Sequence, residues 1–245
     1  MTSTGPGRPP ALPAPHIDIC PVAWYLRQMF DFAFNAQRFA VYLIPTLLGI
    51  IMHEVAHGWM ASRKGDQTAR FMGRLTLNPV SHFDALGAAV FLLTSLGTGF
   101  IFGWAKPVPV DPRYFRKPKQ GMALTALAGP VSNFLLALVL LVGARIMVDH
   151  AAYSALNQGI LDFLVSTAVL SIGLGLFNLV PIPPLDGAKV LFSLLPDRMY
   201  DTMLRYERIG MFVLWGLVLL DVGSGALNSA IAWVFRIFCR IVGLS

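Results

Sequence analysis

Two histidines and a glutamate stand inside an apolar stretch of the chain, in the sequence IIMHEVAHGWM of residues 50–60. They form the motif H-E-x-x-H, made by His53, Glu54 and His57. Residues four apart lie on the same side of a helix, so both imidazoles project from one face and can bind one Zn²⁺ ion. Glu54 borders that face and can act as general base toward the attacking water.

The apolar setting favours a metal site over histidines that only hydrogen-bond to their neighbours. An ionisable side chain at bilayer depth costs at least ~2.5–3.5 kcal/mol on insertion scales. Three such side chains stand within five residues here, so they need a strong partner. A divalent metal ion is such a partner, and the motif therefore predicts metal binding.

Catalytic zinc usually takes three protein ligands, so one ligand remains to be found beyond the two histidines. Asp186 follows an apolar run, in FNLVPIPPLDGAKVL, where prolines break the helix and Gly187 permits a tight turn. A carboxylate at such a break can turn toward a metal, although Asp186 would also suit the N-cap of the helix that follows. His82, in NPVSHFD, is the rival third ligand, but its polar, turn-like surroundings favour a loop residue.

The composition places these residues in a membrane protein. Of the 245 residues, 56% are hydrophobic and 13% are charged, whereas soluble domains carry about 25% charged residues. The net charge of +6 comes from Lys and Arg beside apolar runs, which the positive-inside rule explains. We therefore expect the lipid bilayer of a cell membrane, a bacterial inner or plasma membrane, as a partner, and no nucleic acid.

The apolar runs predict an all-α polytopic membrane protein with about five transmembrane helices. The runs cover about 40–62, 121–148, 160–181, 209–220 and 227–242, and a further hydrophobic segment covers 85–103. We predict four parts: a disordered Pro-rich tail over 1–21, an interfacial amphipathic helix over 22–38, a membrane core over 39–195, and C-terminal transmembrane helices over 196–245.

The positions of Lys and Arg predict the topology. The stretches 63–84, 104–120 and 182–208 are basic and should face the cytoplasm. A single crossing by 85–103 would put two of them on opposite sides, so we predict that this segment dips in and returns, with an ordinary transmembrane helix as the alternative. The N-terminus is then outside, the C-terminus inside, and the histidine motif toward the cytoplasmic side.

Two further sets of residues could serve the site. Ala126, Gly129, Asn133 and Ala137 form a stripe of small residues on one helix face, which lets transmembrane helices approach closely. Asn178 lies eight residues before Asp186, near the buried end of its run, where an amide needs partners. This amide can make a structural hydrogen bond within the protein, or it can bind the carbonyl of a substrate.

Taken together, HEVAH at 53–57, ALAGPVSN at 126–133 and NLVPIPPLDG at 178–187 resemble the signatures of the site-2 protease family of intramembrane zinc metalloproteases. No loop is long enough for a PDZ domain, and GRLTLNPVSHFDALG at 73–87 and FGWAKPVPVDPR at 102–113 resemble the family's compact bacterial branch. The resemblance implies a catalytic core of three transmembrane helices and transmembrane protein substrates. It implies one Zn²⁺ per chain, held by His53, His57 and Asp186, with Glu54 as catalytic base and Asn178 on the substrate carbonyl. Gly129 and Asn133 would serve substrate binding or core packing.

Two other classes use similar residues. A membrane transporter or ion-binding protein also carries His, Glu and Asp within the bilayer. A catalytically silent relative would bind a partner without cutting it, but such relatives tend to lose the base, and Glu54 is intact. The sequence therefore favours the protease.

Overall fold

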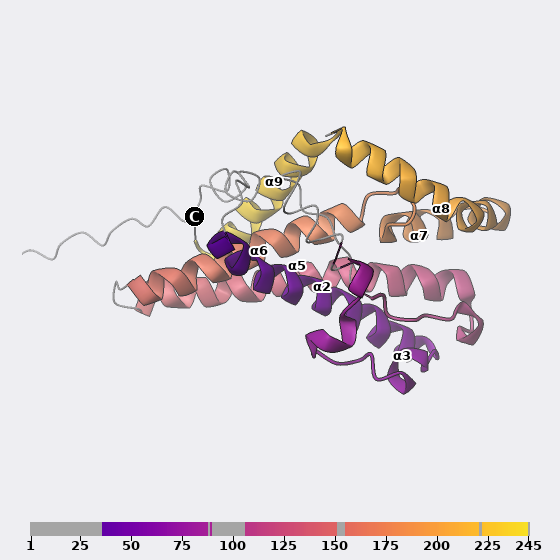
Figure 1. Ribbon diagram of the computed structural model, residues 1–245, viewed down its shortest axis with the longest axis horizontal. Coiled ribbons are helices and arrows are strands. Elements are labelled where there is room, and N and C mark those ends of the chain that lie inside the picture. Colours follow the sequence, from indigo (N-terminus) through magenta and orange to yellow (C-terminus); the bar gives the residue numbers. More distant parts are fainter. Residues whose placement is uncertain (1–35, 88, 90–105, 151–154, 221, 245) are drawn as a thin grey trace, which may run out of the picture.

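The computed structural model describes residues 36–87, 89, 106–150, 155–220 and 222–244, and the elements within these ranges are helices (Figure 1). The long helices are α2 (Ala36–Lys64), α5 (Pro118–His150), α6 (Ala155–Asn178), α8 (Asp197–Leu219) and α9 (Ser224–Val242). Shorter elements are α3 (Thr68–Phe71), η1 (Pro79–His82), η2 (Pro112–Tyr114) and α7 (Asp186–Ser193). The predicted all-α class is confirmed for the described residues.

Several predicted segments fall outside the described residues. They are the tail over 1–21, most of the interfacial helix over 22–38, and nearly all of the segment 85–103. Residues 36–38, which the prediction gave to the interfacial helix, are the first residues of α2.

Helix α5 is the centre of the structure, because α2, α6, α7 and α9 all pack against it. Its buried face carries mostly small residues, including Ala126, Gly129, Asn133 and Ala137, so the predicted stripe lies in helix contacts. Its outer face exposes large apolar side chains: Leu124, Val131, Leu135, Val139, Val142 and Ile146. A helix with small residues inside and large apolar residues outside suits a lipid environment.

Within the described residues, three helices are long and apolar enough to cross a membrane. They are Pro118–His150, Leu156–Asn178 and Ser224–Val242. Their contact is an apolar core in which Leu141 of α5, Val169 and Ile172 of α6, and Phe235 of α9 are almost completely buried. The chain is therefore a helical membrane protein. This core packs the C-terminal half of α5 against α6 and α9.

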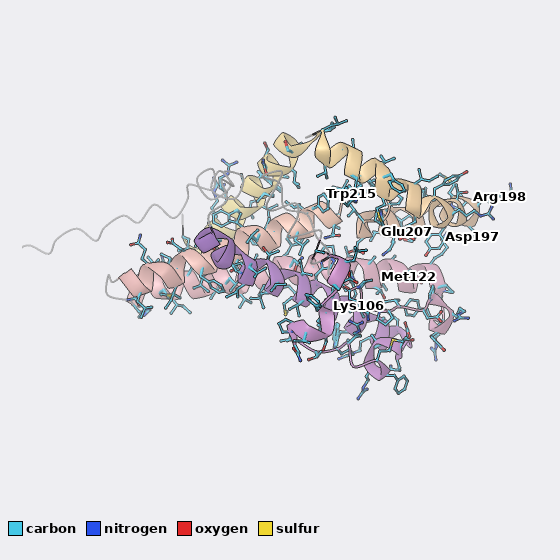
Figure 2. All side chains as sticks on the ribbon, viewed as in Figure 1. Lys106, Met122, Asp197, Arg198, Glu207 and Trp215 are labelled. Carbon is cyan, nitrogen blue, oxygen red and sulfur yellow. The ribbon has the colours of Figure 1, made fainter. Side chains whose placement is uncertain are left out.

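The basic stretches meet at one end of the bundle. The backbone N–H of Asp111 donates to Oδ2 of Asp66 at 2.7 Å, which joins the segment after α2 to the segment before α5. The Lys119 ammonium lies 3.0 Å from Oδ1 of Asp197, which joins the start of α5 to the start of α8. In Figure 2, Asp197 and Arg198 mark this start of α8. The three stretches therefore share one end, as their charges predicted.

Residues 196–245 include the helices α8 and α9, which contact opposite ends of α5. Lys119, near the start of α5, contacts the start of α8, whereas Arg145, near the other end of α5, donates to the carbonyl of Gly243 at 2.8 Å. In Figure 1, α8 leads away from this end to a bend, and α9 leads from the bend back to the bundle, where it packs on α5 and α6. The apolar part of α8, Ile209–Val218, is too short to cross a membrane alone. The end of α9 consequently lies at the end of α5 opposite the basic stretches.

Candidate metal centre

Two imidazoles and one carboxylate converge between α2 and α7. Nε2 of His53 lies 3.0 Å from Oδ2 of Asp186, and Nε2 of His57 lies 3.2 Å from the same oxygen. The two rings stand edge to face with centroids 4.5 Å apart. One potential ligand atom from each of the three residues lies within 4.8 Å of the others. Two imidazole nitrogens and one carboxylate oxygen form a donor set that Zn²⁺ accepts, so the group can hold a metal ion.

The helix α2 supplies both histidines from the face that packs on α5. A Cβ atom at Gly129 of α5 would lie 2.5 Å from Cε1 of His57 and 2.6 Å from Nε2 of His53. Only a residue without a side chain leaves room for the two rings. Gly129, predicted for core packing or substrate binding, is therefore the point where α5 makes space for the imidazoles.

Asp186 reaches the histidines because the chain reverses tightly after α6. Hydrogen bonds from Leu185 N–H to the Ile182 carbonyl and from Ala188 N–H to the Leu185 carbonyl shape the turn. A Cβ atom at Gly187 would lie 2.1 Å from the carbonyl oxygen of Leu179, so the turn closes only around glycine. The alternative that Asp186 is an N-cap is wrong, because Leu185 holds that position and Asp186 is the first residue of α7. Its carboxylate is thereby free to face the histidines.

Each member of the cluster has an outer partner. Nδ1 of His57 lies 2.7 Å from the carbonyl oxygen of Thr125, so it carries the proton and leaves the lone pair on Nε2. Nδ1 of His53 lies 3.1 Å from Nδ2 of Asn133, and the Lys189 ammonium lies 3.7 Å from Oδ1 of Asp186. Sequence analysis missed Thr125 and Lys189. A backbone carbonyl has no sequence signal, but Lys189 stands one helical turn after Asp186 and could have been found.

Glu54 faces a different neighbour. Its Oε2 accepts a hydrogen bond of 2.9 Å from the backbone N–H of Val108, in the extended segment 106–110. Pro107 and Pro109 have no N–H, so Val108 is the donor between them. Val108 is buried and its side chain packs against Gly58 of α2. The sequence places this segment in the basic stretch 104–120, but it carries no local signal of the contact with Glu54.

Two predicted candidates make their hydrogen bonds outside the cluster. Asn178 is the last residue of α6, and its Nδ2 donates to the carbonyl of Leu174 in the same helix at 2.9 Å, which is the structural alternative. His82 lies in the turn η1, where its Nε2 is 2.9 Å from the carbonyl oxygen of Thr76. The metal-binding group found among the described residues does not include His82. As a third ligand, Asp186 is therefore favoured over His82.

Comparison with known proteins gives one consistent class. Residues 142–220, which include Asp186, match the model of "Peptidase family M50". The chain is 39% identical over 189 residues to "Putative zinc metalloprotease YwhC" of Bacillus subtilis, which covers 75% of this chain and 82% of that protein. It is 28% identical over 219 residues to "Putative zinc metalloprotease Rip2" of Mycobacterium tuberculosis, covering 87% of this chain and 80% of that protein. No solved structure matches the chain.

The helical membrane architecture and the His-His-Asp group define a membrane protein of the metalloprotease class. The chain belongs to peptidase family M50, the site-2 protease family of zinc metalloproteases. The family resemblance that the three motifs suggested is thus confirmed.

Proposed function

We propose that this chain is an intramembrane zinc metalloprotease that hydrolyses peptide bonds in or near the transmembrane segments of membrane proteins. The observation that carries the proposal is the convergence of two Nε2 atoms and Asp186 Oδ2, with Glu54 beside His53 on α2. The site needs little reorganisation, because helices and a glycine-closed turn already hold these side chains.

The residues of the chain divide the reaction among them. His53, His57 and Asp186 would hold one zinc ion, which would supply Lewis-acid activation of water and of the scissile carbonyl. The Glu54 carboxylate takes a proton from the attacking water and delivers it to the leaving amine. The N–H of Val108 holds one carboxylate oxygen and leaves the other for that proton. The amide of Asn178 would give up its hydrogen bond to the carbonyl of Leu174 and donate to the substrate carbonyl instead. Its position at the end of α6 permits this role.

The setting of the site supports substrates that lie in the bilayer. We place α2, α5, α6 and the combined α8–α9 as four passages, with the basic end toward the cytoplasm of a cell membrane. His57 is seven residues from Lys64 at the basic end of α2, about 10 Å along a helix, which puts the site toward the cytoplasmic side. Lys106 N–H donates to the carbonyl of His82 at 2.9 Å, so the two flanks of 85–103 are neighbours, which favours a segment that returns to its own side.

Replacing the proposed base tests the function. We expect Glu54→Gln to lower cleavage by about 10²–10⁴-fold, the usual contribution of general acid–base catalysis. Zinc binding should stay at the wild-type level, because Glu54 is not one of the three proposed ligands. Suitable measurements are zinc stoichiometry of the purified protein and a comparison of membrane-protein fragments released in cells with wild type or variant.

The same pair of measurements separates the protease from a transporter. A protease should release peptide fragments as wild type and release none as the Glu54→Gln variant, while both forms bind zinc. A transporter gives no reason to expect this difference. If membranes with wild type and variant yield the same fragments, the protease proposal is wrong. If the wild type binds no zinc, the assignment of the three ligands is wrong.

A further inference from the structure

Asn133 is a fully buried amide in direct contact with a proposed ligand. It lies on the small-residue face of α5, its side chain has no exposed surface, and its Nδ2 is 3.1 Å from Nδ1 of His53. Its Oδ1 is also buried and has no hydrogen-bond partner. A buried polar atom without a partner costs about 1–3 kcal/mol, so this amide calls for an explanation beyond helix packing.

The protonation of His53 supplies that explanation. A neutral imidazole carries one proton, and the nitrogen that binds a metal must be the one without it. Nε2 of His53 faces Asp186 and His57, so a metal at this site requires the proton on Nδ1. The group beside Nδ1 is the Asn133 amide, and Nδ1–H needs an acceptor there. The amide nitrogen cannot accept, whereas the amide oxygen can.

We propose that Asn133 is the positioning residue of His53: its Oδ1 accepts the proton-bearing Nδ1 and fixes the tautomer and ring orientation in which Nε2 binds the metal. A half-turn of the amide about χ2 exchanges Oδ1 and Nδ2, which brings the unpartnered oxygen against Nδ1. The inference rests on the proposed function, because it takes His53 to be a metal ligand. It gives Asn133 a specific part beyond packing or contact with substrate.

The other histidine supplies a precedent within the same site. Nδ1 of His57 already meets an oxygen acceptor, the backbone carbonyl of Thr125, at 2.7 Å. Thr125 and Asn133 lie eight residues apart on the same face of α5, with Gly129 midway between them and against both rings. The face of α5 thus provides an acceptor for each imidazole, from the backbone for His57 and from a side chain for His53.

The experiment measures zinc affinity of the purified full chain in detergent by competition with a chelator of known affinity. We expect Asn133→Leu, which has similar size and no acceptor, to weaken zinc binding by about 10–100-fold, the usual effect of losing such a partner. Asn133→Asp keeps an acceptor oxygen and should bind zinc within about threefold of wild type. Ser171→Ala is the control, because it removes a different fully buried polar group, a hydroxyl that contacts none of the proposed ligands, and it should leave the affinity unchanged.

Each outcome decides the matter. Wild-type affinity in Asn133→Leu, or a large loss in Asn133→Asp with the fold intact by circular dichroism, overturns the inference. If Asn133→Leu does not fold, the Asn133→Asp variant alone decides. A packing role predicts that a buried carboxylate weakens zinc binding, whereas an acceptor role predicts that the zinc affinity is retained. Failure of the proposed function looks different, since the wild type itself would then bind no zinc or Glu54→Gln would still cleave.

Discussion

The two faces of α2 around residue 54 are built in different ways. His53 and His57 face the helix α5, whose Gly129 and Thr125 carbonyl contact the rings directly. Glu54 instead faces the extended segment 106–110 and accepts the backbone N–H of Val108. The metal side is therefore made by helix packing, and the base side by a loop.

This difference implies that metal binding and catalysis can be disturbed separately. The loop side depends on a chain of contacts: Val108 is placed by packing on Gly58, and Asp111 is tied to the buried carboxylate of Asp66. None of these contacts involves His53, His57 or Asp186. A substitution on the helix side should thus change zinc binding, whereas one on the loop side should change cleavage alone.

The largest expected effect is on the helix side, at Gly129. A Cβ atom there would overlap ring atoms of both histidines at 2.5–2.6 Å, and both rings sit between helices that leave them little room to move. We expect Gly129→Ala to reduce zinc affinity by at least about 100-fold, since outer-partner losses alone reach that size and here the ligands themselves must shift. Cleavage should fall with it. Zinc stoichiometry of the purified protein measures the effect.

Gly143 on the same helix is the matched control. A Cβ atom at Gly143 meets only Cδ1 of Leu164, at 3.8 Å, an ordinary contact. Gly143→Ala should keep zinc and cleavage, and it should gain up to ~1 kcal/mol from helix propensity. Full zinc occupancy with unchanged affinity in Gly129→Ala would contradict the packing of α5 against the imidazoles.

An intermediate effect is expected on the loop side, at Val108. Val108→Pro removes the N–H that Glu54 accepts, and hydrogen bonds to charged groups contribute ~1.5–3 kcal/mol. We expect cleavage to fall at least about tenfold while zinc affinity stays unchanged. Val108→Ala keeps the N–H and removes side-chain packing, so cleavage should fall less in this variant than in Val108→Pro. Equal losses in the two variants would show that the side chain of Val108, and not its N–H, supports Glu54.

The smallest effect is expected farther along the same loop, at Arg113. Its side chain donates hydrogen bonds to Asp111 and holds the pKa of that carboxyl below its ordinary value of 3.8. The pair can therefore contribute stability at neutral pH, and the contribution is lost as the pH falls through the lowered pKa. Because the guanidinium is exposed and screened, Arg113→Ala should leave the melting temperature and cleavage at neutral pH unchanged. A clear drop in either the melting temperature or cleavage would show that the sensitive part of the loop extends beyond the contact between Asp111 and Asp66.

Much of the site could be predicted from local sequence. The spacing of His53 and His57 fixes a shared helix face, and three ionisable groups in an apolar run require a partner. The prolines and Gly187 after Asn178 indicate a chain reversal, which the close approach of Leu179 explains. The small residues of α5 indicate a helix contact, because large side chains would prevent it.

The C-terminal part shows where such inference stops. Local hydropathy gave two apolar runs in 196–245 and therefore two crossings, but whether consecutive helices turn back or continue depends on what they pack against. Phe235 and Ile231 of α9 dock on the core of α5 and α6, and Arg145 binds Gly243 at the far end. These contacts join residues far apart in the chain, 98 positions in the case of Arg145 and Gly243, and no local pattern encodes them.

The sequence by itself thus determined the family, the membrane class, and the residue types that could bind a metal and move a proton. Only the tertiary structure decided that Asp186, 133 positions after His53, completes the group, since a ligand set depends on distances across the fold. The structure alone also assigned partners to these groups: Thr125 to His57, Asn133 to His53, and Val108 to Glu54. Two of these partners are backbone atoms, which every residue possesses, so their placement comes from packing and not from residue identity.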